Sequence, residues 1–213
     1  GGETAIMPDV YQPGDFDMAG FSVGVVERKR LIDGTRTIRP GDLLIGLASS
    51  GFHSNGYSLI RKAVTEVGGL GYDDYVPELE RTVSDVLLEP TRLYVRCVQD
   101  LLQHYRSKTV IRGMAHITGG GLPDNLQRIL PSGCTARVDC SSWDLAPEFR
   151  WLQDLAGIAR DEMFRVFNMG IGFVLVVNPY FADSVCRQIA EHRIPTWIIG
   201  EIVAGDGSVE MVS

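Results

Sequence analysis

An apolar run that changes into a small polar loop and then into a helical pattern constrains this chain more than any other feature. Residues 43–48 indicate a buried strand, and residues 54–67 place apolar side chains at the spacing of one helix face. The loop between them is rich in serine, glycine, histidine and asparagine. Unpaired N–H groups and the positive end of the helix dipole face such a loop. The junction therefore predicts an anion site, with phosphate as its natural ligand.

A simpler interpretation of the same junction is an ordinary helix cap. Ser54 or Asn55 would accept a hydrogen bond from the first turn of the helix, and His53 would be merely exposed. The anion-site interpretation instead has the hydroxyl, imidazole and amide groups of the loop contacting the ligand. The junction alone leaves both interpretations open.

A second strand-loop-helix pattern follows later in the chain. The strand pattern of residues 110–117 leads into Thr-Gly-Gly-Gly at residues 118–121, and the next helical pattern stops at Pro131. Glycines let the backbone approach a ligand closely, at a cost of roughly 1 kcal/mol each relative to alanine. The segment is either a second anion loop or a glycine-rich turn. His116, on the strand, faces the same cavity or lies in the core.

Two further segments carry residue types that suit ligand binding. Glu3 and Thr4 follow two glycines, a pairing that suits Mg²⁺ held near polyphosphate oxygens. Residues 167–172 place Asn168 and two glycines at the head of an apolar strand, where the amide binds a polar ligand or caps a turn. Neither segment identifies a site by itself.

Charge and composition limit the classes of partner. The 213 residues carry 27 acidic and 20 basic side chains, a net charge of −7, without a basic run that could follow a nucleic-acid backbone. No apolar stretch reaches the about 18 residues of a membrane span. We therefore expect neither nucleic acid nor membrane as a partner. The four cysteines form no C-x-x-C pair, which favours a reducing cytoplasm.

The order of the predicted elements indicates an α+β fold. Strands and helices mix without strict alternation, and residues 196–203 and 208–212 predict a closing antiparallel hairpin. We expect a layered α/β/α domain with a mixed β-sheet. Residues 18–27 have strand composition, and the polar turn segment at residues 31–41 is the candidate domain boundary. Because the chain opens without methionine, we expect that it has been cut from a longer protein.

Together, these segments resemble the phosphoribosylformylglycinamidine cyclo-ligase (AIR synthetase) family. The matching motifs are GGETAIMP at residues 1–8, ASSGFHSNGYSLIR at 48–61, HITGGG at 116–121 and FNMGIG at 167–172. The resemblance implies an N-terminal domain that binds ATP and dimerises, of which residues 1–30 would be the end. It also implies an AIR synthetase-related C-terminal domain at residues 31–213.

The resemblance implies an ATP-dependent ring closure in purine biosynthesis. ATP phosphorylates the formyl amide oxygen of formylglycinamidine ribonucleotide, and an amidine nitrogen then attacks that carbon with loss of phosphate. The product is 5-aminoimidazole ribonucleotide. The implied partners are the ribonucleotide, ATP and Mg²⁺, in a cytoplasmic homodimer. Because most of the first domain is missing, we expect the 213-residue chain alone to be inactive.

The resemblance also suggests roles for individual residues. We expect His53 to be catalytic, with an ordinary pKa of about 6.5 that suits moving a proton. Glu3 and Thr4 would bind Mg-ATP, with Glu3 as metal ligand, whereas Ile6 stands where the family usually has a second glutamate. The expected substrate and phosphate contacts come from three loops: Ser50, Ser54, Asn55, Gly119, Gly120, Gly121 and Asn168.

Two other functions stay open at this point. The chain could be a non-catalytic phosphate- or nucleotide-binding module that retains the fold, or part of a related ATP-dependent synthetase or kinase. The His-Ser-Asn-Gly-Tyr block at residues 53–57 and the lack of a cysteine near Gly1 argue against a sister enzyme.

Overall fold

The computed structural model describes residues 14, 16 and 20–212, and the chain divides into two units after Leu31. In the first unit, residues 20–27 form no strand, and a short 3₁₀ helix, η1, covers Arg28–Arg30. The strand predicted for residues 18–27 is therefore wrong in its described part. A strand needs a neighbour for its backbone N–H and C=O groups, and no described strand pairs with this segment.

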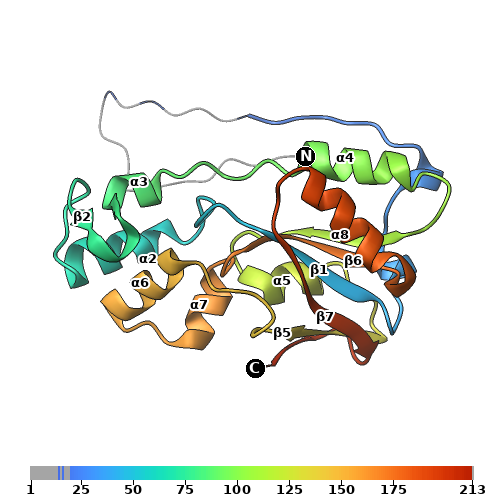
Figure 1. The fold of residues 1–213 in the computed structure, drawn as a ribbon. Coiled ribbons are helices and arrows are strands. Elements are labelled where there is room, and N and C mark those ends of the chain that lie inside the picture. The colour runs from blue at the N-terminus through green and yellow to red at the C-terminus, as the bar shows by residue number, and fades with distance from the viewer. Residues whose placement is uncertain (1–13, 15, 17–19, 213) are drawn as a thin grey trace. The chain divides into compact units, whose positions relative to one another are not determined.

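The second unit, residues 32–213, is built on a six-stranded mixed sheet (Figure 1). The strand order is β4-β6-β1-β7-β5-β8, and every neighbouring pair is antiparallel except the parallel pair β5–β8. The mixed sheet predicted from the sequence is confirmed. The strands are β1 Leu43–Ala48, β4 Ile111–His116, β5 Cys134–Asp139, β6 Ile171–Val177, β7 Thr196–Ala204 and β8 Val209–Val212.

The predicted hairpin between the last two strands is wrong, because β5 lies between β7 and β8. The turn after β7 crosses the start of β5, where Gly205 N–H donates to the Gly133 carbonyl and Gly207 N–H to the Cys134 carbonyl. Thr135 adds a hydroxyl contact to Ser208 at 3.1 Å. These bonds direct β8 to the far side of β5.

Successive side chains of β1 point to opposite faces of the sheet and pack in two separate cores. Leu44 packs in a core that includes α5, Gly121–Gln127. Ile45 packs in the other core, with α4, Val95–His104, and α8, Ala182–Glu191. The sheet is thus covered by helices on both faces, which confirms the layered α+β class.

A third core lies among helices that Figure 1 shows grouped beside one end of the sheet. Its centre is aromatic: the ring of Phe52 lies 5.0 Å from that of Phe149 and 5.6 Å from that of Phe167, between centroids. These helices are α2 Tyr57–Arg61, its π-helical continuation η2 Lys62–Val67, α3 Val83–Leu87, α6 Pro147–Ala156 and α7 Arg160–Val166. Because Phe52 belongs to the loop after β1, this core anchors that loop.

Short elements complete the described part of the chain. They are α1 Gly34–Thr37, β2 Tyr75–Val76, η3 Pro77–Leu79, β3 Arg81–Thr82 and η4 Pro179–Phe181. Strands β2 and β3 form a separate two-stranded sheet. Among the described helices, none has the length and apolar character needed to cross a lipid bilayer.

Replacing Leu44 with alanine tests the central position of β1. Leu44 is fully buried, so Leu44→Ala should lower the free energy of unfolding by about 2–5 kcal/mol through lost burial and a residual cavity. Urea denaturation followed by circular dichroism measures this change. In the matched control Leu88→Ala, the side chain is 76% exposed, and we expect a change below about 0.5 kcal/mol. Equal losses in the two variants would contradict the core placement.

Candidate functional site

The loop between β1 and α2 turns through left-handed backbone. His53 and Ser54 have φ values of 53° and 57°, and Gly56 has 71°. Helix α2 therefore begins after Gly56, which supplies no side-chain cap. The cap interpretation of Ser54 and Asn55 is wrong, because the residue that precedes the helix is Gly56 and no described side chain accepts a hydrogen bond from the first helical turn.

Asn55 instead joins the two predicted junctions. Its Oδ1 accepts a hydrogen bond from Gly119 N–H at 3.0 Å, and its Nδ2 donates to the His53 carbonyl at 2.7 Å. The second loop is fixed in turn by Asn125, whose Nδ2 donates to the Gly121 carbonyl at 2.8 Å. The structure thus brings together the two loops that the sequence analysis treated as separate anion sites.

The three glycines of the second loop serve different purposes. A Cβ at Gly120 would lie 2.5 Å from Asp124 Oδ2, and one at Gly121 would overlap the Phe164 carbonyl oxygen. Packing within the chain thus favours glycine at both positions, and the contact of their backbone with a ligand stays a prediction. Gly119 is exposed, and a Cβ there would meet nothing nearer than Asn55 Oδ1 at 4.0 Å. Of the three, Gly119 is the one that faces open space.

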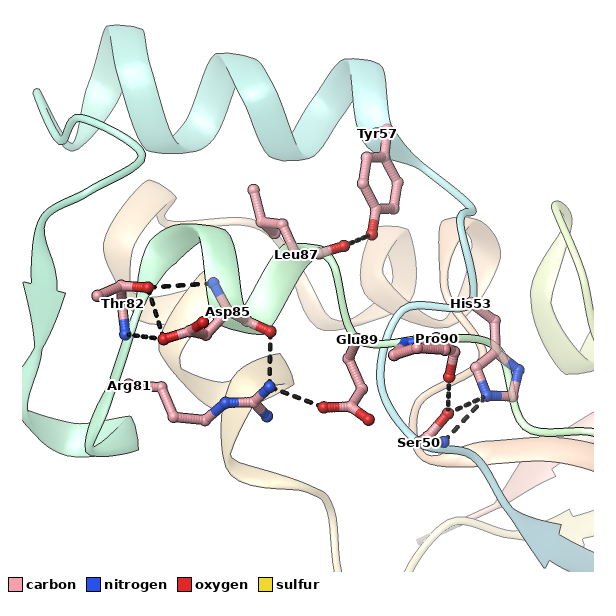
Figure 2. Close-up of polar contacts among 9 residues, drawn as sticks. All are labelled: Ser50, His53, Tyr57, Arg81, Thr82, Asp85, Leu87, Glu89 and Pro90. Carbon is pink, nitrogen blue, oxygen red and sulfur yellow. Dashed lines mark hydrogen bonds and ion pairs between the residues drawn. The ribbon is translucent and has the colours of Figure 1, made fainter. Parts of the chain in front are cut away.

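His53 holds the first loop through one ring nitrogen, as Figure 2 shows. Its Nε2 accepts from Ser50 N–H at 3.0 Å and from Arg92 N–H at 3.4 Å. The Ser50 hydroxyl lies 3.0 Å from the same nitrogen and donates to the Pro90 carbonyl at 2.7 Å. Because backbone N–H groups can only donate, Nε2 must be unprotonated, and the ring proton of the neutral imidazole lies on Nδ1.

Burial lowers the pKa of His53 to about 4, with smaller contributions from His116 and Arg92. The side chain is only 5% exposed, and a charged imidazolium there would lose its hydration. The pKa of about 6.5 assumed from the sequence is therefore wrong. At neutral pH, His53 is uncharged, and its ring accepts the hydrogen bonds that fix the loop. It does not gain or lose a proton near pH 6.5, where an ordinary histidine does.

Asn168 also occupies a structural position. Its side chain is fully buried, its Nδ2 donates to the Gly51 carbonyl at 2.8 Å, and its Oδ1 accepts from Gly170 N–H at 2.8 Å. These bonds tie the first loop to the start of β6. They agree with the turn-cap interpretation, and they correct the predicted direct contact between Asn168 and a ligand.

The remaining predicted residues differ in their surroundings. Ser54 is exposed beside Asn55, whereas the Ser50 hydroxyl is already bonded to Pro90. Glu3 and Thr4, the predicted Mg-ATP residues, lie outside the described residues. His116 is exposed at the end of β4, so the core interpretation of that residue is wrong.

The segment between α3 and α4 forms a wall of the site that the sequence analysis missed. A Cβ at Gly51 would lie 3.7 Å from Glu89 Cβ, and Glu89 pairs with Arg81 at 2.7 Å. Figure 2 shows this ion pair on one side of Pro90 and His53 on the other. Burial raises the pKa of the nearby Glu148 carboxyl, and a backbone hydrogen bond and the charge of Arg81 offset part of this rise. No sequence motif identifies this segment as part of the site, because only the folded chain brings it next to the first loop.

A metal site is not apparent in the described residues. No group of three or more histidine, cysteine, aspartate or glutamate side chains there is arranged to hold a metal ion. The predicted metal ligand, Glu3, lies outside the described residues.

Comparison with known proteins identifies the family. The family model described as AIR synthase related protein, C-terminal domain, matches residues 39–213. A phosphoribosylformylglycinamidine cyclo-ligase of Oleidesulfovibrio alaskensis is 46% identical over 202 residues, which are 95% of this chain and 56% of that protein. One of Geobacter sulfurreducens is 49% identical over 212 residues, which are 100% of this chain and 60% of that protein. The chain thus spans less than two thirds of the length of these relatives.

Solved structures support the fold. Thiamine-monophosphate kinase from Stenotrophomonas maltophilia matches with a TM-score of 0.60 and 17% identity, over 87% of this chain and 54% of that one. At this identity the likeness concerns the fold alone.

Removing the Asn55 amide tests the link between the two loops. Asn55→Ala should speed hydrogen exchange of the Gly119 amide, measured by NMR, and should cost about 1 kcal/mol of stability for the lost bonds. Asn55→Asp is the matched control, because it retains an oxygen that can accept from Gly119 N–H. Unchanged Gly119 exchange in Asn55→Ala would contradict the link.

The low pKa of His53 predicts a specific loss of stability in acid. The unfolded chain binds the proton near the ordinary pKa of 6.5, and the folded chain only near 4. The unfolded state therefore holds more protons between these values, so stability falls as the pH drops from 6.5 to 4. His53→Gln, which does not titrate, should lose less stability over this range in urea denaturation. Parallel pH profiles of the two proteins would contradict the assigned pKa.

Proposed function

Because this chain belongs to the AIR synthase related family through its C-terminal domain, we propose that it supplies that domain to a phosphoribosylformylglycinamidine cyclo-ligase. Relatives at 46% and 49% identity carry that name. Within the structure, the hydrogen bond between Asn55 and Gly119 carries the proposal. It joins the HSNGY and TGGG motifs into one surface, as a common phosphate-binding role requires.

The proposed reaction closes an imidazole ring in formylglycinamidine ribonucleotide. The terminal phosphoryl group of ATP moves to the formyl amide oxygen, which becomes a good leaving group. An amidine nitrogen then forms a bond to the formyl carbon, the C–O bond breaks, and phosphate leaves while the nitrogen loses a proton to solvent. Holding both ends of this flexible substrate in place removes much of the entropic barrier.

The described residues divide into groups that touch the ligand and groups that position them. We assign phosphate contact to the exposed Ser54 hydroxyl and to the backbone around Gly119. Ser50, His53 and Asn55 set the shape of the loop, since the Ser50 hydroxyl, His53 Nε2 and the Asn55 amide bond to other parts of the chain, whereas His53 Nδ1 is buried without a partner among the described residues. His53 is thus a positioning residue in this proposal.

The rest of the proposal concerns the longer protein. There, ATP and the ribonucleotide are substrates, Glu3 and Thr4 contact Mg-ATP, and Glu3 contributes to Mg²⁺ binding. When bound, Mg²⁺ would offset charge on the moving phosphoryl group. The homodimer and the cytoplasmic location stay predictions from the family resemblance.

A chimeric enzyme tests the proposal. The part of the Geobacter sulfurreducens relative that this chain does not match would be joined to residues 1–213. We expect ATP-dependent formation of 5-aminoimidazole ribonucleotide by the chimera and none by the 213-residue chain alone. Product is measured by the colour reaction of its aromatic amine.

Variants of the chimera distinguish the site from the fold. His53→Ala should lower the rate of ring closure at least about tenfold, equivalent to about 1.4 kcal/mol. His104→Ala, an exposed histidine in α4, is the matched control and should leave the rate unchanged. Because His53 only positions the loop, its replacement should not remove a pH-rate transition near 6.5. A folded but inactive chimera, or full activity of the chain alone, would overturn the proposal.

A further inference from the structure

The guanidinium of Arg92 has a nitrogen without a hydrogen-bond partner among the described residues. Arg92 lies half-buried in the segment between α3 and α4, and its Nε is buried without a hydrogen-bond partner. None of the ion pairs among residues 20–212 includes it. A buried donor left unpaired costs about 1–3 kcal/mol, and more in a charged group. A ligand bound to the terminal nitrogens of the same guanidinium would offset this cost.

The backbone of Arg92 is fixed beside the first loop. Its backbone N–H donates to His53 Nε2 at 3.4 Å, and two residues later the Tyr94 hydroxyl donates to the Ala48 carbonyl at 2.8 Å. Ala48 is the last residue of β1, so this segment is attached where the first loop begins. The charge of Arg92 is close enough to act on both neighbours: it adds to the lowering of the His53 pKa that burial causes, and it offsets part of the rise that burial causes in the pKa of Tyr94.

Further polar groups lie on the segments that meet at the end of β1. Ser49, the first residue of the loop, has a buried hydroxyl without a partner. The ring of the exposed His116 lies 6.2 Å from that of Tyr94, between centroids. The acidic neighbour Glu89 is already paired with Arg81 at 2.7 Å. The guanidinium of Arg92 is therefore not neutralised by a described carboxylate.

We propose that Arg92 binds a phosphate group through its guanidinium. The planar guanidinium presents parallel N–H donors that match two phosphate oxygens, and such charge-assisted pairs are among the strong hydrogen bonds of proteins. The identity of the phosphate carrier rests on the proposed function: it is the ribose 5′-phosphate of the substrate or the phosphoryl group that moves from ATP.

Phosphate titration of the 213-residue chain tests the proposal. The probes are inorganic phosphate, ribose 5-phosphate and ATP, measured by calorimetry and by the ¹⁵N–¹H signal of Arg92 Nε, which Arg92→Lys identifies by its loss. We expect saturable binding that shifts this signal and weakens at least about tenfold in Arg92→Met. Arg96→Met, an exposed arginine at the start of α4, is the matched control and should bind as the parent does.

The probes also separate the two carriers. Tighter binding of ribose 5-phosphate than of inorganic phosphate supports the substrate phosphate, and tighter binding of ATP supports the nucleotide. Equal weakening by Arg92→Met and Arg96→Met, an unmoved Arg92 Nε signal or the absence of saturable binding would overturn the proposal. If Arg92→Met does not fold, two measurements still test the proposal. The Nε signal of the parent chain should shift on adding phosphate, and Arg92→Lys should bind phosphate more weakly than the parent chain. An inactive chimera with intact phosphate binding at Arg92 would refute the cyclo-ligase function alone.

Discussion

Backbone pairing of β1 on both of its edges is the constraint on which the rest of this domain depends. Strand β1 bonds to β6 on one side and to β7 on the other, so its position is set by the sheet. The loop between β1 and α2 therefore begins at a fixed position. Phe52 then secures the loop in the helical core, and a short, strained segment with two left-handed residues can persist only because both of its ends are held.

Within that frame, the site is organised by the pairing of buried polar groups. The neutral His53 ring, the Asn55 amide and the buried Asn168 amide each connect backbone segments that are distant in sequence. Most polar atoms of the loops are satisfied inside the protein, and this makes the few unpaired ones informative. The Ser49 hydroxyl, His53 Nδ1 and Arg92 Nε lie on the segments that converge at the end of β1. Polar groups that hold the loops and polar groups that are left unpaired thus lie together in one small region.

The sequence predicted what depends on local pattern. Apolar runs located β1 and β6, and serine and glycine composition located both loops, because these signals come from neighbouring residues. The prediction of a hairpin between β7 and β8 was wrong because strand pairing depends on contacts between distant residues. Here β5 lies between the two strands. The pKa of His53 could not be predicted either, since it follows from burial in the folded chain. Arg92 carries no motif, and its significance appears only in three dimensions.

The parallel pairing of β5 and β8 has a consequence for how the domain folds. Arg137 in β5 and Glu210 in β8, which lie side by side, are 73 residues apart in the chain. Closing a loop of that length has an entropic cost that local contacts do not meet, and parallel strands cannot form through a tight turn. We therefore expect β8 to join the sheet only after β7 and β5 have paired. In that order of folding, β5 presents an open edge to other chains until β8 covers it.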